Sequence, residues 1–590
     1  MKNFERSSGC GLINKDFLNK KVTLVGWVNK RRDHGNLIFI DLRDRTGLVQ
    51  IVFNPEVSKE AHDTAHHLRS EYVISIQGLV VLRAANTINK DIATGLFEIQ
   101  ANQITIFSKS KTLPFSLEEA DCVEEELRLK YRYLDLRRPE MQVKLAFRTK
   151  FILALRNFLN CEGFLEIETP ILTKNTAEGA REFIVPSRIN KGSFYALPQS
   201  PQLYKQLLMA SGLERYFQIA RCFRDEDLRA DRQPEFTQLD MEMSFINEID
   251  IQNIIERMLQ YCLKETVNQD LSIPLQRMTY DEAFRLYGSD KPDLRYDIPI
   301  YDLTSIFEGI ELNFIKSVLT IGGKVGALHI PKHKFTRSEL DYWVELAKKN
   351  KASGLLWIRI DENGVVESPV SKFLPEGFYN KLLTLISKFE KGDTLFLIAG
   401  KYKDAWTQLG RLRNQIAAKL NLIPDGVMKW LWITDFPLFE FDEKDNRWCS
   451  VHHPFTSPQE GWQNKKPQDV KARAYDIVLN GIELGGGSIR IHDSEVQAQI
   501  FKCLGFDQKE MEKQFGFLLT AQEFGFPPHG GIALGIDRLM MLLLNCNSIR
   551  EVIAFPKTQT GHDPLMDAPT TINPAKLKDY GLELVVEEKE

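Results

Sequence analysis

The chain has 590 residues, more than one hydrophobic core accommodates, so we expect three or four domains. Its 43% hydrophobic and 26% charged residues are typical of a soluble globular protein, and its net charge of −4 excludes nucleic-acid binding through bulk positive charge. The eight cysteines form no C-x-x-C pair, and no apolar run approaches about 20 residues. These features argue against a disulfide framework, a zinc site and a membrane partner, and they predict a cytoplasmic protein.

Residues 1–110 are predicted to form an all-β module. The strand candidates are Val22–Val28, Leu37–Asp44, Leu48–Phe53, Val73–Leu82 and Phe97–Phe107, with a helical stretch, Glu56–Glu71, after the third. Five strands with one helix in that place are the order of an OB-fold barrel, although another small β-barrel would fit the same pattern.

A basic turn, residues 30–35, joins the first two strands and leads to Phe39. Basic residues beside an exposed aromatic ring provide the phosphate contacts and the stacking surface that single-stranded nucleic acid needs. Spacing alone does not separate this function from a core position for Phe39.

Residues 111–140 are expected to be a linker that turns from acidic to basic, either a solvated surface or a docking strip for a polyanion. Apolar residues at helical spacing then predict a long amphipathic helix, Met141–Asn160. The alternating segment Phe164–Leu172 follows as a predicted strand, and Pro170 restricts it to a sheet edge that could pair across a subunit interface.

The segment 215–245 carries the most information in this chain. Two alternating runs flank a loop, residues 224–235, that is crowded with arginine and carboxylate. Loops of this length usually carry function, and guanidinium groups are bidentate clamps for phosphate. We therefore predict a triphosphate site between two strands.

Three further clusters carry candidate chemistry. Gln202 and Lys205 share a helix face and suit a small carboxylate. Asp476 and Glu483 precede a triple glycine and Arg490, and they could hold Mg²⁺ on phosphates if a bend brings them together, the alternative being an ordinary glycine turn. A glycine-rich strand at 530–535 runs into an apolar helix, which places Arg538 at a helix N-terminus suited to anions.

His452 and His453 are adjacent, and on a strand they would point to opposite sides, which argues for a substrate contact and against a shared metal. Residues from about 297 to 418 contain Lys-rich helices and strand-like runs without any dense motif. We expect a separate inserted α+β domain there, with no function suggested by its residues.

The clusters, in this order, resemble the class II aminoacyl-tRNA synthetases. FLEIETPIL is similar to motif 1, the 215–245 segment to motif 2 and G-I-D-R at 535–538 to motif 3. The barrel narrows the resemblance to the aspartate, asparagine and lysine branch. The insertion, with TAEGAREF, LPQSPQLYKQ, HHPFTSP and GGGSIRIH, resembles the bacterial type of aspartyl-tRNA synthetases.

The resemblance implies an α+β multidomain fold. It consists of an OB-fold anticodon-binding domain (1–110), a hinge (111–140), a catalytic antiparallel-sheet domain in two parts (141–296 and 419–590) and an inserted domain (297–418). It implies an aspartate–tRNA ligase that uses ATP and Mg²⁺, with tRNA-Asp and L-aspartate as partners, in a homodimer with Pro170 at the interface. An asparaginyl or lysyl enzyme, or a non-catalytic tRNA-binding paralogue, is the alternative.

Site residues carry over by position. The catalytic residues implied are Arg224, Glu226 and Arg538. The residues implied to bind ATP are Arg224, Asp225, Glu226, Gln233, Glu483, Gly535, Ile536, Asp537 and Arg538. Those implied to bind aspartate are Glu178, Gln202, Lys205, Arg224, His452 and Arg490, with Lys205 and Arg490 on its side-chain carboxylate. Asp476 and Glu483 are implied to hold Mg²⁺.

In the barrel, the resemblance implies that His34, Phe39 and Gln50 contact the anticodon. His34 stands where relatives strict for tRNA-Asp often have leucine, which resembles the relaxed type that also charges tRNA-Asn. Asn86 stands where relaxed relatives have glycine, so the two positions disagree about specificity.

Overall fold

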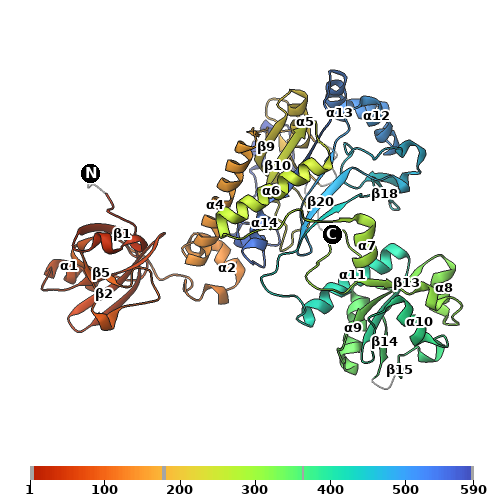
Figure 1. Ribbon diagram of the computed structural model, residues 1–590. Helices are drawn as coiled ribbons and strands as arrows, with labels where there is room; N and C mark the ends of the chain where they lie inside the picture. The colour runs from red at the N-terminus through yellow and green to blue at the C-terminus, as the bar shows by residue number, and fades with distance from the viewer. Residues whose placement is uncertain (1–4, 176–180, 362–364, 586–590) are drawn as a thin grey trace. The chain divides into compact units, whose positions relative to one another are not determined.

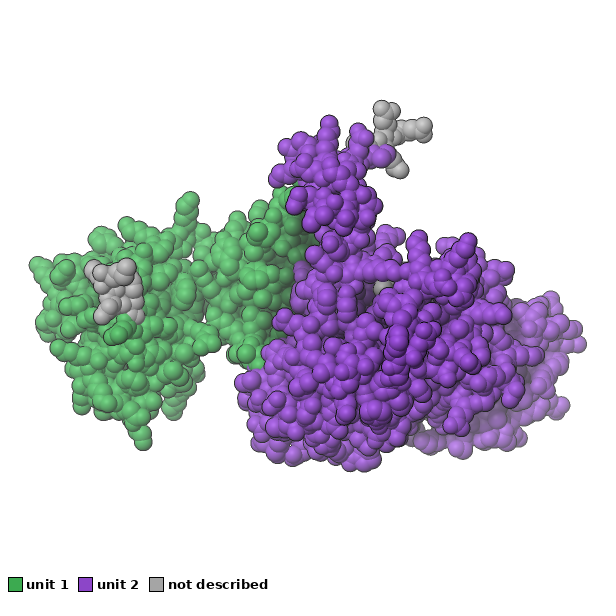
Figure 2. All heavy atoms as spheres, turned by 90° about the horizontal axis from the view of Figure 1, so that it is seen from above, with its two compact units in different colours: residues 1–149, 550–571 green, residues 150–549, 572–590 purple. Residues whose placement is uncertain are grey.

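A computed structural model describes residues 5–175, 181–361 and 365–585 of the chain (Figure 1). They form two compact units, coloured separately in Figure 2. The first comprises residues 1–149 and 550–571, and the second comprises residues 150–549 and 572–590. No helix within the described ranges combines the length and the apolar character needed to cross a membrane.

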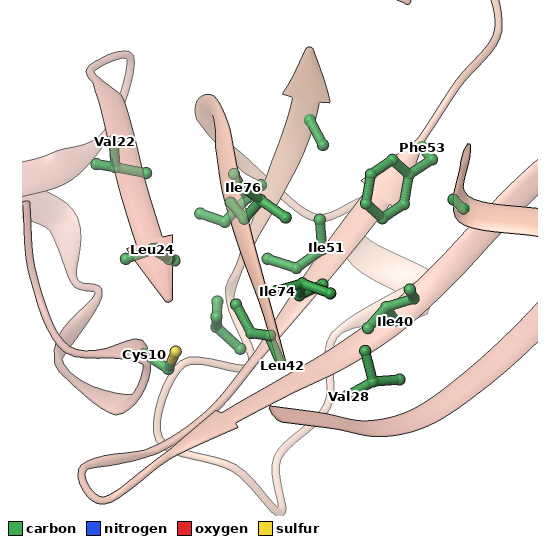
Figure 3. Packing of buried hydrophobic residues seen from close by; sticks show 14 of the residues in the cluster. Cys10, Val22, Leu24, Val28, Ile40, Leu42, Ile51, Phe53, Ile74 and Ile76 are labelled. Carbon is green, nitrogen blue, oxygen red and sulfur yellow. The ribbon is translucent and has the colours of Figure 1, made fainter. Parts of the chain in front are cut away.

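The first unit begins with a closed barrel of strand order β1-β2-β3-β5-β4, which confirms the predicted module. Its elements are β1 (Lys21–His34), β2 (Leu37–Asp44), β3 (Gly47–Phe53), α1 (Lys59–His66), β4 (Val73–Leu82) and β5 (Phe97–Ser108). Alternate residues of each strand point inward, so that Val22, Leu24, Ile40 and Ile74 pack together in a buried core (Figure 3).

One expectation about the barrel is wrong. The basic residues 30–34 lie on β1, not in a turn, because β1 stays paired with β2 as far as His34 opposite Leu37. The turn is reduced to Gly35 and Asn36, and Gly35 has a φ of +62°, which a glycine adopts without strain. The basic side chains are therefore held on a strand beside Phe39.

Short helices α2 (Glu125–Lys130) and α3 (Arg132–Asp135) follow the barrel, and α4 (Pro139–Cys161) begins in the first unit. Pro139 occupies the first position of α4, where its missing N–H costs no hydrogen bond. This confirms the predicted helix, which is two residues longer at its start and one residue longer at its end.

The second unit is built on an eight-stranded sheet of order β11-β17-β20-β21-β22-β10-β9-β6 (Figure 1). Most neighbours are antiparallel, and the β11–β17 and β6–β9 pairs are parallel. The strands are β6 (Leu165–Glu166), β9 (Arg215–Phe223), β10 (Glu235–Ser244), β11 (Gln276–Thr279), β17 (Trp430–Thr434), β20 (Ala474–Leu479), β21 (Ile482–Ile489) and β22 (His529–Gly535).

The predicted strand 164–172 is shorter than expected. Only β6, Leu165–Glu166, pairs with β9, because Pro170 has no N–H to donate and restricts the residue before it. Helices of this unit are α5 (Gln202–Ala210), α6 (Glu248–Val267), α7 (Tyr280–Tyr287), α12 (Ser494–Cys503), α13 (Gln508–Glu523), α14 (Ile536–Leu543) and α15 (Pro574–Asp579). Two small hairpins, β7 (Ile184–Pro186) with β8 (Phe194–Ala196) and β18 (Phe439–Asp442) with β19 (Arg447–Ser450), complete it.

A second sheet, of order β12-β13-β16-β14-β15, forms from residues between α7 and β17. Its strands are β12 (Ile300–Asp302), β13 (Lys324–Ile330), β14 (Leu356–Ile360), β15 (Val366–Glu367) and β16 (Thr394–Gly400). Helices α8 (Asn313–Thr320), α9 (Arg337–Lys349), α10 (Phe378–Leu385) and α11 (Tyr402–Lys419) accompany it. Two buried clusters, one around Trp406 and one around Phe307, give this sheet its own core, as the predicted α+β insertion requires.

Candidate active site

A cavity of about 410 Å³ opens in the second unit over one face of the large sheet. Its walls come from the β9–β10 loop, from α5, from β21, from the β22–α14 junction and from the loop after β19. Eleven of the residues predicted from the sequence line it: Gln202, Lys205, Arg224, Glu226, Gln233, His452, Glu483, Arg490, Gly535, Asp537 and Arg538.

The remaining predicted residues lie elsewhere. Asp476 is buried behind the wall, where its Oδ1 lies 3.2 Å from His452 Nε2. Ile536 is fully buried in α14, and Asp225 is exposed, 3.9 Å from Arg181. Glu178 falls outside the described residues.

One end of the cavity is a dry network of four charges. Lys205 Nζ lies 2.8 Å from Asp240 Oδ2 and 3.4 Å from Glu242 Oε2. Arg490 donates from Nε to Glu242 Oε1 at 2.9 Å and from Nη1 to Ser488 Oγ at 2.5 Å. The side chains of Lys205 and Arg490 are each 2% exposed, so these ion pairs are hardly screened by water.

Burial and pairing set the ionisation of this network. Burial opposes ionisation of Glu242, but Arg490 and Lys205 more than offset it and lower the pKa of that carboxyl. At Asp240 burial prevails over Lys205, and the pKa is raised. Burial, followed by the nearby Arg490 guanidinium, holds the pKa of His453 well below its usual range, so this imidazole is neutral.

Sequence reasoning missed Asp240 and Glu242 as site residues. The signal was present, because they alternate with Phe236 and Gln238 along one face of β10, and charged residues on a central strand are buried only when they are paired. The two cations of the site are thus already neutralised by the protein itself.

The prediction for the two histidines is corrected. His452 and His453 lie in the loop after β19, not on a strand, and both face the cavity. His452 pairs with Asp476, while His453 hydrogen-bonds Arg490. Among the described residues no group of three or more metal-ligating side chains gathers at this or any other place.

The long loop between β9 and β10 forms the opposite wall, as predicted. The Arg224 guanidinium lies 5.1 Å from the ring centre of Phe236, and Glu226 pairs with Arg232 at 2.9 Å. Arg224 Nε has no hydrogen-bond partner within the described part of the chain. A guanidinium stacked on a ring, with a free donor at a cavity wall, is suited to bind an anion.

The helix that follows β22 completes this wall. Arg538, in the first turn of α14, donates from Nη1 to the Glu483 backbone oxygen at 3.0 Å and pairs with Asp231 at 3.3 Å. Asp537 is buried, and its carboxylate accepts the Thr237 N–H at 2.8 Å, which fixes the start of α14 against β10. Arg538 thus joins the loop to β21.

The triple glycine has a packing reason that the sequence did not reveal. A Cβ on Gly485 would lie 2.0 Å from the Ala533 oxygen, and one on Gly486 would lie 2.4 Å from Asp476 Oδ1. The missing side chain of Gly485 therefore lets β21 approach β22, and that of Gly486 leaves room for the Asp476 carboxylate beside its backbone.

A second candidate site covers the outer face of the barrel. Phe39 is partly exposed between the buried Ile38 and Ile40, so the core alternative for this ring is wrong. The His34 ring meets it edge-on, with 6.0 Å between centroids. Asn86 is exposed in a 3₁₀ turn, Ala85–Thr87.

A polar ladder continues this face across the neighbouring strands. Arg32 makes a bidentate pair with Asp41, at 2.9 and 2.7 Å, and Gln50 donates to Glu98 Oε2 at 2.9 Å. Burial raises the pKa of Glu98 in spite of Gln50 and Arg83. Sequence reasoning named Gln50 but missed Asp41 and Glu98, which only strand pairing places beside it.

An arginine-walled cavity on an antiparallel sheet, together with an OB-type barrel, is the arrangement of an enzyme that carries a nucleic-acid-binding domain. The chain belongs to the class II tRNA synthetases of the D, K and N group, whose family description matches residues 124–559. Residues 22–107 match the OB-fold nucleic-acid-binding domain of anticodon-recognition type.

Several relatives match almost the whole chain. The aspartate–tRNA(Asp/Asn) ligase of Caldanaerobacter subterraneus is 50% identical over 98% of both chains, and that of Geobacillus sp. is 49% identical over 99% of both. The asparaginyl-tRNA synthetase of Pyrococcus horikoshii, solved with asparaginyl-adenylate, shares the fold with a TM-score of 0.60 at 20% identity, covering 94% of this chain and 98% of its own.

Proposed function

We propose that this chain is an aspartate–tRNA ligase, which activates L-aspartate with ATP and transfers it to the 3′-terminal hydroxyl of tRNA. The main observation behind the proposal is that one cavity combines two different binding surfaces. Lys205 and Arg490 lie at a dry end suited to a small acid, and Arg224 and Arg538 line a wall suited to phosphates. The two full-length relatives support the choice of amino acid.

Aspartate is recognised at the dry end in this proposal. Arg490 and Lys205 bind its side-chain carboxylate, and Gln202, His452 and Glu178 surround the rest. Asparagine would not leave these two cations without a counter-charge, because Asp240 and Glu242 already pair with them. Discrimination then rests on replacing a charge-assisted hydrogen bond by a weaker one, about 1 to 2 kcal/mol for each contact.

Activation needs no general base, because the α-carboxylate of aspartate is already a nucleophile at neutral pH. One carboxylate oxygen bonds to the α-phosphorus of ATP while the bond to the bridging oxygen breaks, and the electron pair leaves with pyrophosphate. Arg224 stabilises the charge on the α-phosphate, Glu226 and Gln233 orient the nucleotide, and Arg538 binds the γ-phosphate. The backbone of residues 535–538 seats the nucleotide.

Asp476 and Glu483 would hold Mg²⁺, Glu483 from the cavity lining and Asp476 from just behind it, where its carboxylate now pairs with His452. Carboxylate oxygens from neighbouring strands suit this ion, which usually takes one or two protein carboxylates and completes its shell with phosphates and water. When bound, it neutralises charge on the ATP phosphates.

The barrel recognises the anticodon in this proposal. Phe39 stacks on a base, and Gln50 and His34 contact base edges beside it. Charging of tRNA-Asn as well as tRNA-Asp is the second candidate activity, and His34 together with the relatives' Asp/Asn designation favours it.

We also propose a cytoplasmic homodimer. Large apolar side chains stay exposed on β6 and just after it, among them Leu165, Ile171 and Leu172, each between 48% and 50% exposed. Such a patch beside Pro170 and a short edge strand suits a second copy of the chain.

Aspartate-dependent ATP–pyrophosphate exchange tests the proposal. The expected result is exchange with L-aspartate and none with asparagine or lysine. Exchange with asparagine or lysine alone would assign another enzyme of the branch. Absence of exchange with all amino acids, with tRNA binding retained, would make the chain a tRNA-binding paralogue.

A further inference from the structure

One cation of the cavity has no part in the site described so far. Lys291 comes from the segment between α7 and β12, at the point where the chain enters the second sheet. Its side chain lines the cavity, and its Nζ lies 3.3 Å from Glu483 Oε2. No motif of the sequence pointed to it, because its partner is 192 residues away.

The segment that carries Lys291 is clamped by the second sheet's own helix. Figure 1 shows α11 beside α7, and the buried Arg413 of α11 donates to the backbone oxygens of Asp293, Tyr296 and Ile298 at 2.7, 3.0 and 2.8 Å. The Arg413 guanidinium also stacks on the Tyr296 ring, 4.1 Å from its centre. A fully buried arginine with three backbone acceptors holds this stretch in one conformation.

The contact between the helix and the segment is too close for side chains. A Cβ on Gly288 would lie 1.9 Å from the Trp406 oxygen, and one on Gly410 would lie 2.5 Å from the Tyr287 oxygen. On the other side, a Cβ on Gly481 would lie 3.0 Å from Asp293 Cβ. Because Gly481 is in the turn that leads into Glu483, the segment lies wedged between α11 and the β20–β21 hairpin.

Lys291 differs from Lys205 in its exposure to water. The Lys291 side chain is 43% exposed, whereas Lys205 is 2% exposed and committed to two carboxylates. The Lys291 Nζ lies 3.3 Å from Glu483 and 4.0 Å from Asp290, and both carboxylates are partly exposed to water. Arg538 contacts the Glu483 backbone, so two cations from distant segments flank one residue.

We propose that Lys291 binds the β- and γ-phosphates of ATP and the pyrophosphate that leaves, and that the second sheet serves this reaction by positioning Lys291 through α11. The inference rests on the proposed function. When the carboxylate of aspartate bonds to the α-phosphorus, the bridging oxygen departs with its electron pair, and the Lys291 ammonium pairs with the charge that accumulates on pyrophosphate. No proton is transferred in this step.

The test compares three variants of the full-length protein in ATP–pyrophosphate exchange. Lys291→Met removes the ammonium, Lys291→Arg keeps the charge, and Lys324→Met is the matched control. Lys324 has the same 43% exposure and a similar exposed carboxylate partner, Asp302, but it lies on β13 and outside the cavity lining.

We expect Lys291→Met to raise the KM values for ATP and pyrophosphate about 10- to 100-fold, as loss of a charge-assisted hydrogen bond predicts, with the KM for aspartate unchanged. Lys291→Arg should restore most of the affinity, and Lys324→Met should match the parent. Unchanged KM values in Lys291→Met, or an effect on the aspartate KM alone, would overturn the proposal.

A second measurement separates this inference from the proposed function. Calorimetric titration of the parent and Lys291→Met with ATP, without amino acid, should show the same loss of affinity even if aspartate proves to be the wrong substrate. The positioning role is tested by Gly410→Ala, which would push on Tyr287 and should raise the KM for ATP in the same direction. If Gly410→Ala changes thermal stability without changing the KM for ATP, α11 supports the fold alone.

Discussion

The cavity of the second unit and the outer face of the barrel differ in how far their candidate binding residues are exposed to water. In the cavity, Lys205 and Arg490 are almost completely buried and each is neutralised by a protein carboxylate. On the barrel, Phe39 stays partly exposed, and the Arg32–Asp41 pair beside it is 35% and 16% exposed.

The difference follows from the size of the ligand. A small acid can be surrounded, so its site is dry and its charges are fixed by burial, where each contact is energetically large. A polymer binds to an open face, so its site uses base stacking and water-exposed polar groups. Each of these contacts contributes less binding free energy than a buried ion pair. Substitutions in the two places should therefore differ in both size and assay.

Arg490→Ala should have the largest effect. It leaves Glu242 buried without its main counter-charge, which costs about 3 to 5 kcal/mol, and it removes the proposed contact to the substrate carboxylate. We expect aspartate-dependent pyrophosphate exchange to be abolished, with charging lost in parallel. Near-normal exchange would show that the dry end of the cavity does not bind aspartate.

Arg490→Lys tests whether a loss of pyrophosphate exchange comes from the missing guanidinium or from unfolding of the protein. It keeps a buried cation but not the fork that contacts Glu242 and Ser488, so the fold should survive while exchange remains low. Urea unfolding followed by tryptophan fluorescence measures the stability of each variant.

Acid should weaken the second unit through His529. This side chain is fully buried, and burial lowers its pKa to about 4 in spite of Glu242 nearby, while Arg490 and His492 act in the same direction as burial. The unfolded chain takes up this proton near pH 6.5, so stability falls as pH drops from about 6.5 to 4, by about 3 kcal/mol in all.

His529→Gln tests the assignment of this pH dependence. The variant should flatten the decline of the urea midpoint between pH 7 and pH 5. His453 acts in the same direction, so part of the decline should remain. An unchanged slope would mean that the effect comes from other groups.

The sequence predicted the helices and strands better than it predicted the contacts between them. Period-two alternation located β9 and β10 and all five barrel strands. The alternation is clearest in β1 and β2, where buried and more exposed residues follow each other in turn. The glycine-rich entry to a helix placed Arg538 at the start of α14. These signals depend on residues close together in the chain, so they can be recognised without a structure.

The site residues that were missed depend on tertiary contacts. Asp240 and Glu242 were visible as charges on a strand, but only their pairing with Lys205 and Arg490 shows why they are buried. Lys291 and Glu483 are 192 residues apart, and the whole second sheet lies between them in the sequence.

Phe39→Ala should have a moderate effect confined to tRNA. Stacking of a base on an aromatic ring is worth about 1 to 3 kcal/mol, so kcat/KM for charging should fall by about 5- to 150-fold while pyrophosphate exchange is spared. Phe107→Ala is a suitable control, because that ring is 39% exposed on β5 of the same barrel. Equal loss in both assays would mean that Phe39 supports the fold.

His34→Leu should have the smallest effect, and it addresses the tRNA that is charged. His34 meets the edge of the Phe39 ring, and such contacts contribute about 0.5 to 1.5 kcal/mol. If His34 permits the relaxed specificity, the variant should lower charging of tRNA-Asn relative to tRNA-Asp by about 2- to 10-fold, measured with purified tRNAs. Asn86 is exposed outside this contact, so Asn86→Gly should raise the same ratio if that position also contributes. A parent protein that forms no aspartyl-tRNA-Asn is strict for tRNA-Asp, and the His34–Phe39 contact then serves anticodon binding alone.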